Sequence, residues 1–203
     1  MLDLPDRRAP WVWLAAALWL CCAGVGLYFV WAYDNAPGVA ANAPAAWPER
    51  TSLVRADDRP TLVLLAHPQC GCTRATLGEL AEVLARTPQP PKTYVLFLRP
   101  TLFNAGWEQT SLWRTARSLP NVTVLRDDDG AEAKRFGAET SGQTLLYDER
   151  GTLAFSGGIT GSRGHAGDNA GRASLLALIN RSEVNRRGSN VFGCPLFSAG
   201  TGS

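Results

Sequence analysis

A buried strand, a pair of cysteines and an amphipathic helix follow one another directly within residues 62–84. The apolar run at 62–66 is typical of a buried strand in a parallel sheet. Pro68 ends this strand, because proline cannot donate to the hydrogen-bonding ladder. The next segment has leucines on one side of a predicted helix and charged residues on the other: Leu77, Leu80 and Leu84 against Glu79, Glu82 and Arg86. We therefore expect a strand–turn–helix unit with cysteines at the turn.

Cys70 and Cys72, separated only by Gly71, fall at the amino end of this helix. The unpaired N–H groups and partial positive charge there stabilise a thiolate and lower its pKa. We assign Cys70 as the nucleophile, expecting it to lie further toward solvent, and Cys72 as the resolving partner. The reverse assignment stays open, and so does the simpler interpretation that both are small buried apolar residues. A ring closed by one spacer residue is strained, which makes its disulfide easier to reduce.

Residues 11–33 contain no charge and predict a membrane-spanning helix. At ~1.5 Å per residue the segment spans about 34 Å, slightly more than the hydrocarbon layer. Aromatic residues lie near both of its ends. Arg7 and Arg8 precede it, which favours a cytoplasmic location for the amino-terminal residues 1–10. We expect a single-pass signal anchor in the cytoplasmic membrane with a periplasmic domain. A cleaved signal peptide is the alternative, but its apolar region would be only ~7–15 residues long.

Beyond the anchor, the chain divides into three expected parts. Residues 34–59 are rich in alanine and proline and predict a flexible linker. Residues 60–181 form the globular domain, and residues 182–203 form a tail that carries Cys194. The net charge of +2 and the lack of a basic stripe exclude a nucleic-acid partner.

Within the globular part, strands and helices alternate before a hairpin and a closing helix. Apolar periodicity and turn residues predict these elements in order: a strand at 93–98, a helix at 107–119, a strand at 121–125, a helix at 131–136, hairpin strands at 143–147 and 152–155, and a helix at 169–179. Parallel βαβ units followed by an antiparallel hairpin indicate an α/β fold with a central mixed sheet and helices on both faces.

The strand, dicysteine turn and later hairpin resemble the thioredoxin-like fold. More narrowly, HPQCGCTRATLGEL, FGAETSGQTLLYDERGTLAFSGGIT and SRGHAGDNAG are similar to membrane-anchored thioredoxin-like proteins of the RedB type. This resemblance implies a redox role and says little about the substrate. Thioredoxins carry Cys-x-x-Cys and a cis-proline before the hairpin, whereas this chain has one spacer residue and places Gln143 or Gly142 at the proline position. The loss of that proline leaves room for a metal ion at the thiols.

Four further residues are candidates to tune or extend the dithiol: His67, His165, Cys194 and Gln143. His165 lies with Arg163 in the glycine-rich segment 157–171, which could fold back toward Cys70 and supply a base or a ligand. An exposed loop histidine is the simpler interpretation, and His67 could equally be structural. Cys194 could relay oxidation, bind a metal or be inert.

Three functions remain in view. The first is an outward-facing thiol–disulfide oxidoreductase that needs no cofactor, acting on exported protein thiols and disulfides or coupled to a membrane electron donor. The second is a copper or zinc module built from Cys70 and Cys72 with His165 or Cys194, since thiolates and imidazole suit these ions. The third is a thioredoxin-like interaction module without redox cycling. In the first case, the dithiol–disulfide couple should be more oxidising than that of thioredoxin, whose reduction potential is about −270 mV.

Overall fold

The computed structural model describes residues 9–184 and 186–197 and divides into two units, Met1–Ala36 and Pro37–Ser203. The first unit contains helix α1, Ala9–Asn35. In the described part of the chain, one helix is long and apolar enough to cross a membrane, and it covers the segment that the sequence predicted. Arg7 and Arg8, on which the expected orientation depends, lie outside the described residues.

A five-stranded mixed sheet forms the centre of the second unit, in the order β3-β2-β1-β4-β5. Strand β1 pairs in parallel with β2 and antiparallel with β4, β2 pairs in parallel with β3, and β4 and β5 form the antiparallel hairpin. The strands span β1 Thr61–Ala66, β2 Lys92–Arg99, β3 Val122–Asp128, β4 Gln143–Tyr147 and β5 Leu153–Gly157. All six residues of β1 are buried, as expected for a central strand covered on both faces.

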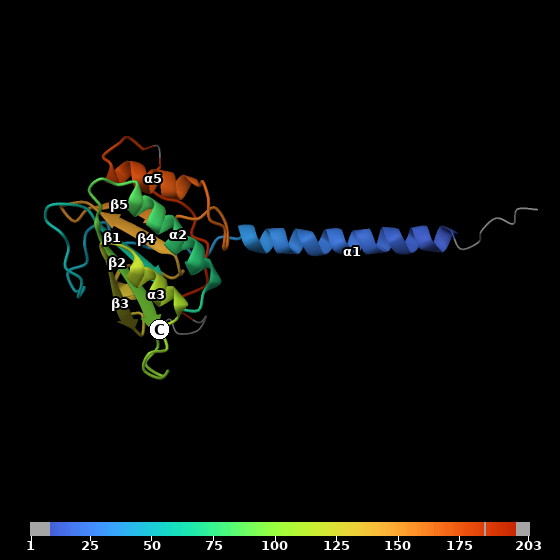
Figure 1. The fold of residues 1–203 in the computed structure, drawn as a ribbon, viewed down its shortest axis with the longest axis horizontal. Coiled ribbons are helices and arrows are strands. Elements are labelled where there is room, and N and C mark those ends of the chain that lie inside the picture. The colour runs from blue at the N-terminus through green and yellow to red at the C-terminus, as the bar shows by residue number, and fades with distance from the viewer. Residues whose placement is uncertain (1–8, 185, 198–203) are drawn as a thin grey trace, which may run out of the picture. The chain divides into compact units, whose positions relative to one another are not determined.

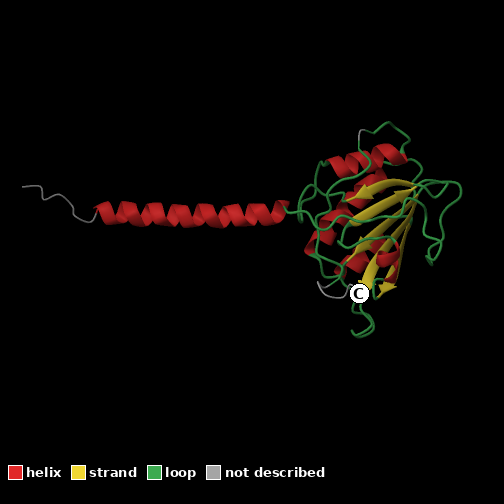
Figure 2. Ribbon diagram, turned by 180° about the vertical axis from the view of Figure 1, so that it is seen from behind, coloured by secondary structure: helices red, strands yellow, loops and turns green. Residues whose placement is uncertain are grey.

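Helices α2 (Gly71–Ala85), α3 (Ser111–Ser118) and α5 (Ala170–Ile179) cover one face of this sheet (Figure 1). Side chains alternate along β1, so Leu62 and Leu64 pack under these helices, whereas Val63 and Leu65 point to the other face. Loops and the short helix α4 (Ala131–Arg135) cover that second face, and Figure 2 shows the molecule from that side. The predicted three-layer α/β arrangement is therefore confirmed.

Two predicted helix features differ in the structure. The helix expected at 107–119 begins only at Ser111, because Thr110 caps it by accepting the N–H of Leu112 at 3.2 Å. Glu79, expected on the solvent side of α2, is 2% exposed and forms an ion pair with Arg172 of α5 at 2.6 Å. Helical periodicity places Glu79 on the side of α2 opposite the leucines. Arg172 of α5 covers that side of the helix as well.

The structure also corrects the flexible linker expected at 34–59, since Ala43, Trp47 and Leu53 pack on the second face of the sheet. Trp47 lies edge-on to the rings of Phe136 and Tyr147, with centroids 5.3 and 5.2 Å away. The N–H of Asn42 donates to the carbonyl of Gly137 at 2.9 Å. Aromatic packing and backbone pairing, which alanine and proline content does not reveal, attach this segment to the domain. The compact unit thus begins near Pro37, and it includes the tail.

Candidate functional site

The dicysteine turn joins the end of β1 to the start of α2, as the sequence predicted. Pro68 lies two residues after the end of β1 at Ala66. Cys70 is the N-cap of α2 and has an extended backbone, with φ −86° and ψ 118°. The N–H of Cys70 donates to the carbonyl of His67 at 3.2 Å, and the N–H of Thr73 donates to the carbonyl of Cys70 at 3.0 Å. These two bonds turn the chain from strand to helix and leave the Cys70 side chain beside the first N–H groups of α2.

The sulfur of Cys70 is the centre of the site, and the residue is 1% exposed. Burial raises the pKa of this thiol, but hydrogen bonds outweigh burial and the net pKa lies below the ordinary value. The donors are the thiol and the N–H of Cys194, and the N–H groups of Cys72 and Thr73. The N–H of Cys194 lies 3.4 Å from Cys70 Sγ. These donors therefore stabilise the thiolate form of Cys70 although the residue is buried.

Cys72 lies in the first turn of α2 and is only partly buried. Its pKa is raised by burial, by the negative charge of Cys70 and by its hydrogen bond to Cys70, while the N–H of Gly164 and the charge of Arg163 oppose this rise. The expectation that Cys70 lies further toward solvent than Cys72 is wrong. The side chain of the N-cap residue Cys70 lies under the tail, and Cys72, two positions further on, keeps part of its surface exposed.

Cys194 comes from the tail and meets the dithiol directly. It is partly buried, and its pKa is raised to about 12 by burial, by its hydrogen bond to Cys70 and by the charges of Cys70 and Cys72, against a lowering by Arg163. Its carbonyl accepts the N–H of Ser141 at 2.9 Å. The sulfurs of Cys70, Cys72 and Cys194 thus meet at one site. The sequence indicated the first two and left the position of Cys194 open.

The glycine-rich segment folds back toward the cysteines as one hypothesis expected, but Arg163 and Gly164 reach the site rather than His165. Arg163 Nη1 donates to the carbonyl of Gly193 at 2.6 Å and so fixes the tail next to Cys194. His165 is exposed, and its Nδ1 lies 2.8 Å from the carbonyl of Arg163. This placement agrees with the simpler interpretation of an exposed loop histidine.

His67 and Gln143 border the site without a described side-chain contact to the sulfurs. His67 Nδ1 accepts the N–H of Gln69 at 3.2 Å, and its ring packs edge-on against Trp107. Burial lowers the pKa of His67, so the neutral ring supplies no positive charge to Cys70. Gln143 is 1% exposed at the start of β4, and its Nε2 donates to Ser156 Oγ at 3.1 Å.

Sequence reasoning missed Ser141, which joins the three segments of the site. Its hydroxyl accepts the N–H of His67 at 2.9 Å and lies 3.0 Å from the hydroxyl of Thr73. Its own N–H holds the carbonyl of Cys194. The serine immediately before the expected cis-proline position was the available signal, but a lone serine carries no pattern.

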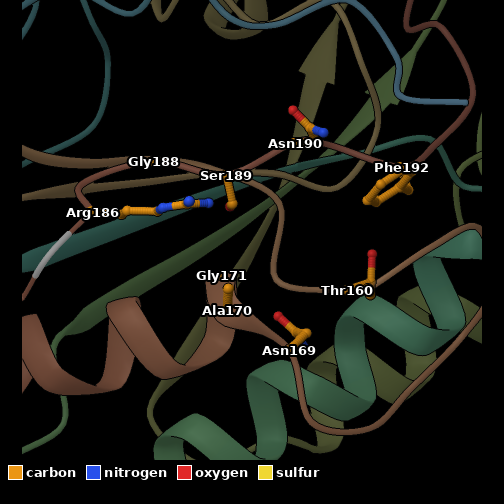
Figure 3. A pocket seen from close by; sticks show the side chains of 10 residues that line it. Thr160, Asn169, Ala170, Gly171, Arg186, Gly188, Ser189, Asn190 and Phe192 are labelled. Carbon is orange, nitrogen blue, oxygen red and sulfur yellow. The ribbon is translucent and has the colours of Figure 1, made fainter. Parts of the chain in front are cut away.

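Of the two further ligands expected for a metal ion, the structure brings Cys194 to Cys70 and Cys72, whereas the His165 ring lies at the carbonyl of Arg163. In the described ranges, no group of three or more His, Cys, Asp or Glu side chains is arranged to hold a metal ion. A pocket of about 510 Å³ lies elsewhere, between the start of α5 and the tail (Figure 3). Thr160 and Asn169 line one side and Arg186 and Ser189 the other, and none of the cysteines takes part.

No family model and no curated protein match the chain. Among solved structures, an uncharacterized conserved protein from Geobacillus kaustophilus superposes with a TM-score of 0.56 at 16% identity, covering 83% of this chain and 95% of that one. A hypothetical protein from Sinorhizobium meliloti 1021 gives 0.50 at 19% identity, with coverage of 81% and 96%. A secreted Mycobacterium tuberculosis disulfide oxidoreductase homologous to E. coli DsbE gives 0.42 at 18% identity, with coverage of 61% and 81%.

The central strand pairs in parallel on one side and with the hairpin on the other, and the dicysteine turn follows it. The fold is thioredoxin-like. The arrangement of strands and helices therefore confirms the expected fold. Cys70 and Cys72 lie at the turn between the central strand β1 and the start of α2.

Proposed function

We propose that the chain is a membrane-anchored thiol–disulfide oxidoreductase whose redox pair is Cys70 and Cys72. The observation that carries the proposal is the set of hydrogen-bond donors around the buried Cys70 sulfur, among them the N–H of Cys194 at 3.4 Å, which lower the pKa of this thiol. A thiolate is the attacking form in disulfide exchange, so a group of donors aimed at one sulfur supports a nucleophile rather than a packing residue. The finer likeness to RedB-type proteins is part of this proposal.

The chemistry follows from the charges around the pair. Cys70 thiolate attacks a disulfide of an exported protein, forming a mixed disulfide and releasing the other sulfur as a thiolate. Cys70 then carries no charge, so the electrostatic contribution that raises the pKa of Cys72 is lost. The N–H of Gly164 and the charge of Arg163 remain to stabilise the Cys72 thiolate. Cys72 attacks Cys70 Sγ, closes the disulfide and releases the substrate as a thiol.

The full chain in detergent, with Cys21 and Cys22 replaced by alanine, tests the pair. After reduction and equilibration with glutathione buffers, we expect two of the three remaining thiols to be lost reversibly. The midpoint should lie above about −270 mV, the potential of thioredoxin, because the one-residue ring is strained. A Cys70→Ser variant should retain its thiols. An intact dithiol in fully oxidising buffer would instead favour an interaction module without redox cycling.

The same sample tests the metal alternative. One equivalent of copper or zinc in the purified protein, together with protection of Cys70 and Cys72 from alkylation, would replace the redox proposal by a metal-binding one. Substitution of His165 and Cys194 in turn would then identify the remaining ligand.

The anchor and its orientation belong to the proposal as well. An α1 that spans the cytoplasmic membrane with its amino terminus inside would place the dithiol in the periplasm, where a disulfide can persist. Alkaline phosphatase fused behind the domain should then be active in cells, and a green fluorescent protein fused at the same point should be dark. The opposite pair of results would put the cysteines in the cytoplasm.

A further inference from the structure

The tail segment 191–197 lies against the loop between α4 and β4 as an added strand would. Thr140 and Pro195 form an antiparallel bridge. Hydrogen bonds flank Cys194 on this bridge, from the N–H of Ser141 to the Cys194 carbonyl at 2.9 Å and from the N–H of Leu196 to the carbonyl of Glu139 at 2.7 Å. Backbone pairing of this kind is a general way in which an extended peptide is held on a protein.

A close approach of two backbones positions this segment. A Cβ atom added at Gly193 would lie 1.9 Å from the carbonyl oxygen of Ser141. Only glycine therefore allows the residue before Cys194 to reach this position. The carbonyl of Gly193 also accepts the guanidinium of Arg163 at 2.6 Å. The tail is thus fixed from two sides at the residue before the cysteine.

The tail places the partly exposed Cys194 against the buried Cys70. Cys70 is 1% exposed, and Cys194 contacts it through both its N–H and its thiol. An external disulfide can reach Cys70 only if the tail moves, whereas Cys194 already lies there. The tail cysteine therefore occupies the position that a substrate cysteine would need.

We propose that Cys194 is a third redox residue, a built-in substrate that takes over the disulfide bond of Cys70 from Cys72. This inference rests on the proposed function and adds a step to it. The thiolate of Cys194, having lost its proton to solvent, attacks Cys70 Sγ of the Cys70–Cys72 disulfide. The Cys70–Cys194 bond forms, the Cys70–Cys72 bond breaks, and Cys72 leaves as a thiolate that takes up a proton. No electrons are gained or lost overall.

The charges around the site favour this step only after oxidation. In the dithiol, the thiolate of Cys70 is one cause of the high pKa of Cys194. A disulfide at Cys70 removes that charge and leaves the favourable charge of Arg163. The exchange then moves the oxidising equivalent from the covered turn to a partly exposed tail, where a protein thiol can reach it.

Peptide mapping of the full chain in detergent, with Cys21 and Cys22 replaced by alanine, tests the step. Trypsin leaves Cys70 and Cys72 together on one peptide and Cys194 on another, so a link between these peptides reports the tail disulfide. After treatment with oxidised glutathione, we expect the Cys72→Ser variant to give the linked peptides in high yield. The matched Cys70→Ser variant should give at least about tenfold less, because Cys194 is held beside Cys70 and its effective concentration there is high.

Gly193→Ala provides a second measurement that does not depend on yield alone. The added methyl group displaces the tail, so the Cys70–Cys194 link should fall in the Cys72→Ser background while alkylation of Cys70 becomes faster. Equal links from Cys70 and Cys72, or no link in Cys72→Ser, would overturn the role of Cys194. If Cys70 and Cys72 still cycle in that case, the proposed oxidoreductase stands. If neither disulfide forms, both proposals fail.

Discussion

Cys70 retains a stabilised negative charge where burial alone would suppress it. The two neighbouring thiols and three backbone N–H groups converge on one sulfur, while the pKa values of Cys72 and Cys194 are raised in response. The thiolate form is therefore favoured at Cys70 and disfavoured at Cys72 and Cys194. This arrangement sets the order in which the thiols react.

Removing the donor thiol of the tail should change the titration of Cys70. In Cys194→Ala the thiolate loses one hydrogen bond, so its pKa should rise toward 9.0, measured by thiolate absorbance in the ultraviolet. Because the folded-state pKa is depressed, the associated stability is present above pH 9.0 and is lost as the pH falls through the folded-state pKa. The variant should lose part of this stability at high pH. An unchanged titration would show that the thiol of Cys194 does not act on Cys70.

Gly71, the spacer between the two cysteines, is not required by the packing of the reduced chain. The reduced chain holds it at an ordinary helical position, with nothing within 4 Å of an added Cβ. Gly71→Ala should therefore stabilise the dithiol form by roughly 0.5–1 kcal/mol in urea unfolding. If the strained ring needs a glycine, the same change should raise the reduction potential. An unaltered potential would remove this requirement.

At the scale of elements, a buried carboxylate joins two helices and the loop between the hairpin and α5. Glu79 of α2 accepts the N–H of Gly167 at 2.6 Å and the guanidinium of Arg172 at 2.6 Å. Asn169 caps α5 by accepting the N–H of Arg172 at 2.8 Å. The loop that carries Arg163 to the cysteines is thereby attached to the helix that carries Cys70 and Cys72.

Glu79→Gln should destabilise the domain by about 2–4 kcal/mol, because the guanidinium of Arg172 loses its buried partner and keeps only the exposed carboxylate of Asp168. Urea unfolding measures the loss. Glu82→Gln is the matched control on the same helix, since Glu82 forms an exposed pair with Arg86 at 3.0 Å, and it should cost less than about 0.5 kcal/mol. Similar losses for both variants would contradict the role given to Glu79.

Across the whole domain, segments from both sides of the central fold complete the second face of the sheet. The segment 37–59, which we call the leader because it precedes β1, contributes Leu53 and Trp47, and the tail contributes Leu196. Both segments also bond to the loop before β4, the leader through the carbonyl of Val39 and the tail through that of Cys194. The core of this domain therefore depends on residues outside 60–181.

Trp47→Ala should lower the free energy of unfolding by about 2 kcal/mol, because the partly buried indole loses its contacts with Phe136 and Tyr147. Val54→Ala, at a side chain that is 66% exposed in the same segment, should change it by less than about 0.5 kcal/mol. A tryptophan substitution as harmless as the valine one would mean that the leader is not part of the core.

Strand and helix order was predictable because each element carries its own period and its own stops. The buried run before Pro68, the cap at Asn169 and the glycine after Phe136 are local signals, and the structure contains all three. The contact of Cys194 with Cys70 was not predictable, since the two residues are 124 positions apart and the tail is placed by backbone pairing with the loop at Ser141. The burial of Glu79 likewise depends on a partner that only the tertiary fold supplies.

The N–H of Gly38 donates to the carbonyl of Val191 at 2.8 Å, three positions before Cys194. Mechanical load transmitted along the leader would reach this bond before it reached the sheet. The covering of the reactive sulfur is thus tied, through one peptide group, to the stretch of chain that follows the apolar helix.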